Sequence, residues 1–132
     1  MITKEKVKTY TKLLEELEYL SQEIFDYFSQ YPILCSFYGY ARYEQFDIQD
    51  NNLYIKYYDH GYDIYDCDNF YIPLKHVYDN TWKQYIDDME EEKQQRIYGI
   101  KLKEQKKKKE ERMKLYQELR AEFENNDEYT SI

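Results

Sequence analysis

Four side chains in this sequence are of types that bind metals or act as nucleophiles: Cys35, His60, Cys67 and His76. They are separated by 25, 7 and 9 residues, so no two of them form a closely spaced pair. Zinc sites normally contain at least one such pair. We therefore predict no metal site and no cofactor, and we interpret both cysteines as small, buried, reduced residues.

Covalent catalysis would have to use Cys35 with His60 or His76, since a nucleophile needs a base and an orienting group. No nucleophile motif surrounds this cysteine, and His60 belongs to an expected turn. The nearby acids lack the glycine and the final glutamate of a calcium-binding loop, and three scattered glycines make no phosphate loop. The sequence predicts a protein that is not an enzyme.

Charge is distributed unevenly along the chain, which has a net charge of −8. Residues 44–92 contain thirteen acidic and three basic residues, whereas residues 101–116 contain eight basic and three acidic residues. As a whole the protein should repel nucleic acids and anionic membranes. Charged residues make up 35% of the sequence, above the usual ~25%, so many must lie on solvated faces.

The acidic segment is also rich in tyrosine, which provides contact area at low entropic cost. Spaced carboxylates can imitate nucleic-acid phosphates and occupy a basic groove on a partner. The partner-binding residues that we predict are Tyr58, Tyr62, Asp63, Tyr65, Asp66, Asp68, Asp87, Asp88 and Glu91. A solvated face, with tyrosines that reflect an AT-rich genome, is the alternative interpretation.

The basic segment could bind phosphates through Lys106, Lys107 and Lys109. Glutamates interrupt it and it offers no aromatic side chain for base stacking, so a solvated helix face is the favoured interpretation. Nucleic acid is therefore not the expected partner. Apolar residues return afterwards at helical spacing, and we predict helix docking or homodimerisation through Met113, Tyr116, Leu119 and Phe123.

The pattern of apolar residues predicts an α+β fold. Residues 4–31 form an amphipathic helix, for which Thr3 is the expected N-cap. Residues 34–74 form an antiparallel meander of three or four strands, with segments at 34–48, 53–58, 62–66 and 70–74. We expect a bulge or a short second segment between Tyr40 and Phe46, turns at 50–52 and 59–61, and a turn or bulge at 67–69.

A second, long charged helix of coiled-coil character is expected after the Asp79-Asn80 cap, with an end near Asn125. It is either continuous through Gly99 or kinked or broken there. The expected organisation is a single domain over residues 1–100, a charged helical extension over 101–124 and a frayed tail over 125–132. The apolar stretch near the end either folds back on the first helix or pairs with another subunit.

No apolar segment approaches the ~20 residues of a membrane span, and residues 1–12 lack the apolar core of a signal peptide. We therefore expect a cytoplasmic protein that does not contact membranes.

Tyr/Asp-rich strands, the segment FYIPLKHVYDNTWKQYI and a Lys/Glu-rich helix follow one another in this chain. In this respect it resembles small phage and prophage proteins of low-GC bacteria, of the anti-CRISPR and anti-defence type. The resemblance implies an inhibitor in the host bacterial cytoplasm whose partner is a nuclease, a CRISPR effector or another nucleic-acid-handling defence protein. The alternatives are an assembly protein that dimerises through the second helix and direct nucleic-acid binding by Lys101–Lys114.

Overall fold

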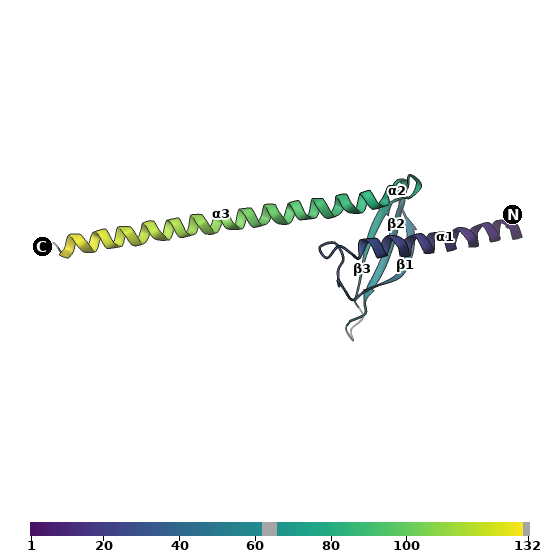
Figure 1. Cartoon of the computed structure of the whole chain (residues 1–132), viewed down its shortest axis with the longest axis horizontal. Coiled ribbons are helices and arrows are strands. Elements are labelled where there is room, and N and C mark those ends of the chain that lie inside the picture. The colour runs from purple at the N-terminus through teal and green to yellow at the C-terminus, as the bar shows by residue number, and fades with distance from the viewer. Residues whose placement is uncertain (62–65, 131–132) are drawn as a thin grey trace. The chain divides into compact units, whose positions relative to one another are not determined.

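The computed structural model describes residues 1–61 and 66–130. The elements are α1 (Lys4–Phe28), β1 (Ala41–Gln49), β2 (Asn52–Asp59), β3 (Cys67–Pro73), α2 (Leu74–Tyr78) and α3 (Trp82–Thr130) (Figure 1). The chain divides into an N-terminal unit, Met1–Lys93, and a C-terminal unit, Gln94–Ile132. The fold is α+β, as predicted.

Helix α1 begins after Thr3, whose side-chain oxygen accepts a hydrogen bond of 3.2 Å from the backbone N–H of Lys6. This confirms the predicted N-cap. The helix ends at Phe28, three residues earlier than predicted, and Ser29 caps it with a backbone bond to Phe25. Only the second half of the helix is buried, through Ser21, Ile24, Phe25 and Phe28.

The described strands form one antiparallel sheet in the order β1-β2-β3. Asp50 and Asn51 both adopt positive φ and join β1 to β2 in a tight hairpin turn. The pairing register shifts between Tyr43 and Gln45, which confirms the predicted bulge. Pro73 ends the edge strand β3, where its missing N–H interrupts no ladder.

The sheet has a packed face and an open face because side chains alternate along each strand. In β2, Leu53, Ile55 and Tyr57 are buried on the packed face. Phe28 of α1 stacks on Phe70 of β3 at a centroid distance of 3.7 Å. Trp82 and Ile86 from the start of α3 complete this core, and Trp82 meets Tyr27 edge-on at 5.7 Å.

Two predicted strand boundaries are wrong. Residues 34–40 form turns, because Phe37 and Gly39 adopt positive φ and the N–H of Tyr40 bonds to the carbonyl of Phe37. Cys67–Asn69 belong to β3 instead of a turn or bulge. The fourth segment, 62–66, lies almost entirely outside the described residues.

Gly61 allows the ring of Tyr40 to pack closely against the backbone, since a Cβ at this position would lie 2.4 Å from the ring. The φ angle of this glycine is not positive, so the contact with the Tyr40 ring is what requires a glycine here.

The second helical region also departs from the prediction. The short helix α2 was not predicted, and Asn80 adopts positive φ in the turn before α3. Helix α3 starts at Trp82 and continues through Gly99 without a break, because helical residues on both sides outweigh one glycine. It also continues past Asn125 to Thr130, so the expected helix end is wrong.

Candidate interaction surfaces

The open face of the sheet is polar and aromatic, and none of its described side chains is buried. Strand pairing places Tyr54 beside Tyr71, with a ring-centroid distance of 5.5 Å, and places Tyr58 opposite Cys67. Lys56 lies between the tyrosines of β2 and pairs with Glu44 at 3.4 Å. The bulge after Tyr43 is what turns Glu44 to this side. The face therefore offers half-exposed rings among charged groups, the composition of a contact surface.

A shallow hollow of about 300 Å³ lies along this face. It is lined by Gln45, Phe46, Asp47, Gln49, Tyr54, Lys56 and Asn69. Most of these groups are hydrogen-bonding side chains, so the hollow favours a polar partner surface over an apolar ligand.

The predicted partner-binding residues do not form one group. Tyr58 is half-buried on the open face, and Asp66 and Asp68 are exposed at the start of β3. Asp88 and Glu91 are exposed on α3, in the helix that follows the end of β3 and α2. Tyr62, Asp63 and Tyr65 lie outside the described residues.

Asp87 has an internal role that sequence reasoning missed. Its carboxylate Oδ1 accepts hydrogen bonds of 2.5 Å from the hydroxyls of both Tyr27 and Tyr31. The bond from Tyr27, followed by that from Tyr31, holds the pKa of Asp87 below its ordinary value. The negative carboxylate raises the pKa of both phenols in return. Asp87 thus joins α3 to the end of α1 and is already engaged.

Asp68 is similarly occupied. Its carboxylate Oδ2 accepts a hydrogen bond of 2.6 Å from the Ser36 hydroxyl and a longer one of 3.4 Å from Tyr57. The backbone N–H of Ser36 donates to the Tyr57 oxygen at 3.0 Å. Burial raises the pKa of Tyr57 to about 12. Asp68 therefore stabilises the turn before β1 while remaining exposed.

The remaining predicted residues belong to the C-terminal unit. Lys106, Lys107 and Lys109 are exposed, and a groove on the helix surface is lined by Gln105, Lys108, Lys109 and Arg112. The predicted docking residues are all more than half exposed: Met113, Tyr116, Leu119 and Phe123. Between Gln94 and Asn125 no side chain is buried.

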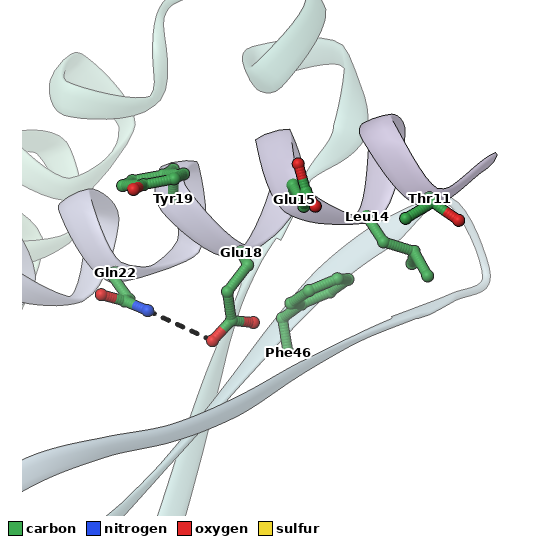
Figure 2. A pocket seen from close by; sticks show the side chains of 7 residues that line it. All are labelled: Thr11, Leu14, Glu15, Glu18, Tyr19, Gln22 and Phe46. Carbon is green, nitrogen blue, oxygen red and sulfur yellow. Dashed lines mark hydrogen bonds between the residues drawn. The ribbon is translucent and has the colours of Figure 1, made fainter. Parts of the chain in front are cut away.

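The larger groove in the N-terminal unit lies between α1 and β1 and was not predicted (Figure 2). Its volume is about 630 Å³, and Phe46 of β1 points up toward Leu14 and Glu18 of α1. Gln22 donates to Glu18 at 3.2 Å, and the Tyr43 hydroxyl donates to the same carboxylate at 2.9 Å. Leu14 belongs to the apolar side of α1 and is nevertheless exposed. Nothing in the sequence indicates this exposure, so the groove could not be predicted.

Both cysteines are free thiols. Cys35 is buried, and burial raises the pKa of its thiol to about 11. Cys67 is exposed on the open face, so its predicted burial is wrong. His76 lies against Thr81 at 2.8 Å and against the Tyr85 ring at 4.8 Å. Among the described residues no three metal-binding side chains gather.

Within residues 1–61 and 66–130, no helix has an apolar stretch that could span a bilayer. Comparison with known proteins found no protein family, no curated protein and no solved structure that matches this chain.

Proposed function

We propose that this protein is a non-enzymatic interaction module that binds a nucleic-acid-handling protein through the acidic, tyrosine-bearing surface of its N-terminal unit. The open sheet face carries the proposal. It presents Tyr54 and Tyr58 of β2 and Tyr71 of the adjacent strand β3 half-exposed, and no described side chain on that face is buried. Tyrosine rings of this kind provide rigid contact area with a hydrogen-bonding edge.

Charge supports the class of partner. The N-terminal unit contains nineteen acidic and nine basic residues, so it carries most of the negative charge of the protein. Exposed carboxylates such as Asp66, Asp88 and Glu91 would meet a basic groove favourably and would be repelled by nucleic acid itself. Attraction to a basic groove and repulsion from nucleic acid are both expected of a phage anti-defence inhibitor that occupies the groove of a nuclease or CRISPR effector.

Competition for DNA tests this proposal. A panel of purified bacterial nucleases, including CRISPR effectors, is loaded with fluorescent DNA, and displacement by the protein is followed by anisotropy. We expect displacement from at least one of them, weakened by 300 mM salt because charge contributes to the contact.

Two triple variants separate the acidic residues of the N-terminal unit from acidity elsewhere in the chain. Asp66→Asn, Asp88→Asn and Glu91→Gln together should weaken displacement at least tenfold. The matched control, Glu110→Gln, Glu111→Gln and Glu118→Gln, removes the same charge from the C-terminal unit and should leave displacement intact. Equal effects of the two variants, or no displacement from any nuclease, would contradict the proposal.

The exposed apolar residues of the C-terminal unit favour a second candidate, an assembly protein that pairs through this helix. Met113, Tyr116, Leu119 and Phe123 recur in steps of three and four residues, which places them on one side of α3. A chain ending at Gly99 would then be a monomer at concentrations where the full chain is a dimer. Equal masses of the two chains in light scattering would exclude this candidate.

A further inference from the structure

The apolar stripe of α1 is longer than the surface on which the helix packs. It follows steps of three and four residues, a spacing that keeps side chains on one side of a helix. Its members are Val7, Tyr10, Leu14, Leu17, Ser21, Ile24 and Phe28. Ser21, Ile24 and Phe28 are at most 2% exposed, whereas Val7 is 50% and Tyr10 62% exposed. The first half of the stripe is therefore uncovered, and it continues directly into the core.

The helix is also divided in charge at the same place. Residues 4–14 carry Lys4, Lys6, Lys8 and Lys12 against a single acid, Glu5. Residues 15–28 carry no basic residue and five acids: Glu15, Glu16, Glu18, Glu23 and Asp26. A parallel pair of such helices would bring like charges together, while an antiparallel pair would bring each basic half against an acidic half.

We propose that the uncovered half of α1 is a dimer interface, which pairs antiparallel with α1 of a second copy of this chain. This inference goes beyond the proposed function and rests on a different surface, since α1 lies on the packed side of the sheet.

A twofold axis near residue 12 gives a consistent register. Residues at equal distance on opposite sides of the axis face each other, so Val7 faces Leu17 of the second copy and Tyr10 faces Leu14. Leu13 lies next to the axis and approaches its own counterpart. Lys4 comes within one helical turn of Glu18 of the second copy, and the groove beside Leu14 and Phe46 gives the incoming helix an apolar floor.

The helix of the C-terminal unit is less suited than α1 to form a dimer interface. The side of α3 that contains Tyr98, Leu102 and Tyr116 also contains Lys109 and Arg112, at the same spacing of three and four residues. Cations in the centre of a helix pair reduce its stability. In α1, no charged residue interrupts the stripe from Val7 to Phe28.

Sedimentation velocity on the full chain tests the interface. We expect a dimer at about 50 μM and a rise of at least tenfold in the dimer Kd for Tyr10→Glu with Leu14→Glu. Both side chains are exposed, so circular dichroism should show unchanged helix content. The matched control, Tyr116→Glu with Leu119→Glu in the C-terminal unit, should remain a dimer. A monomeric wild type, or a dimer lost only in the control, would overturn the proposal.

Charge reversal gives an independent test. Changing Lys4, Lys6, Lys8 and Lys12 to Glu should weaken the dimer at least tenfold, since it places acid against acid in the antiparallel pair. The same change at Lys101, Lys103, Lys106 and Lys107 alters net charge equally and should not weaken it. Equal weakening by both variants would contradict α1 as the interface.

Cross-linking fixes the direction of the helices. In a Cys67→Ser background, Leu13→Cys should form a disulfide-linked dimer under mild oxidation, because the two copies of this position meet near the axis. Val7→Cys should not, because its counterpart lies about ten residues away along the helix, or roughly 15 Å. Efficient cross-linking of Val7→Cys would show a parallel pair and overturn the antiparallel register.

Discussion

The N-terminal and C-terminal units use aromatic residues in opposite ways. In the N-terminal unit Phe28, Tyr57 and Trp82 are almost fully buried and contact further rings. In the C-terminal unit Tyr98, Tyr116 and Phe123 are 61–68% exposed. One unit is thus held by a shared core, and the helix of the other depends on local interactions such as the pair between Arg120 and Glu124 at 3.1 Å.

Substitutions should therefore act differently in the two units. Loss of packing should unfold the N-terminal unit cooperatively, because its helices and strands share one core. The C-terminal unit, with no buried side chain between Gln94 and Asn125, should respond to helix propensity and to salt. Trp82, the single tryptophan, reports on the N-terminal unit, and circular dichroism reports on both.

The largest effect is expected from truncation of a buried ring. Phe28→Ala removes the side chain that stacks on Phe70, and we expect a loss of about 3–5 kcal/mol in the free energy of unfolding. Urea denaturation followed by Trp82 fluorescence measures it. Phe123→Ala, at a ring that is 68% exposed, should change this value by less than about 0.5 kcal/mol. Similar losses in both variants would show that the two units do not differ in how far their rings contribute to stability.

Alkaline pH should also act on the N-terminal unit. The pKa of Tyr57 is raised from 10 to about 12, so the folded state holds its proton more tightly than the unfolded state. This contribution, about 2–3 kcal/mol, is present below pH 10 and is lost as pH rises from 10 to 12. Between pH 10 and 12 the free energy of unfolding should fall less steeply for Tyr57→Phe than for wild type. Tyr116→Phe should show the same pH dependence as wild type. A less steep fall for that variant would contradict the role of Tyr57 in the alkaline loss of stability.

Removing the charge of Asp87 should cost about 2 kcal/mol at pH 7, because Tyr27 and Tyr31 both donate to this carboxylate. Since the pKa of Asp87 is lowered in the folded state, the contribution is present above about pH 4 and is lost as pH falls further. The difference between Asp87→Asn and wild type should therefore shrink in acid. Asp88→Asn is the control, and an equal loss there would show that the tyrosine bonds contribute little.

The smallest effect is expected at Gly99. A Cβ at this position meets no atom within 4 Å, so Gly99→Ala should gain only helix propensity, about 1 kcal/mol. We expect a higher midpoint for the loss of helix signal at 222 nm, with no change in the Trp82 transition. A shift of the Trp82 transition by a similar amount would show that the two units unfold together.

Periodicity predicted the regular parts of the fold. Leu53, Ile55 and Tyr57 alternate with polar and tyrosine side chains, which is typical of a strand, and Thr3 marks the start of α1. Both signals are local, since each depends on residues only a few positions apart. The turns at 34–40 were missed because Phe37 adopts a backbone conformation that its residue type does not indicate.

The candidate surfaces were harder to predict. Asp87 lies in an acidic run that is typical of a solvated helix face, and its bonds to Tyr27 and Tyr31 join residues 60 and 56 positions apart. The exposure of Tyr10 and Leu14 was missed for a related reason. An amphipathic stripe indicates which side of a helix is apolar, but the extent of the sheet beneath it decides how much of that side is covered.

The tight turn at Asp50 and Asn51 has a consequence for the order of folding. It joins β1 and β2 by a local connection, so this hairpin can form within about 1–10 μs. Helix α1 must instead find β2 and β3 across a chain segment of some thirty residues, which adds the entropy of loop closure. We therefore expect the hairpin to form first and α1 to pack on it afterwards. Substitutions at Ile24 to Phe28, the residues of α1 that contact the hairpin, should slow folding as well as lower the free energy of unfolding.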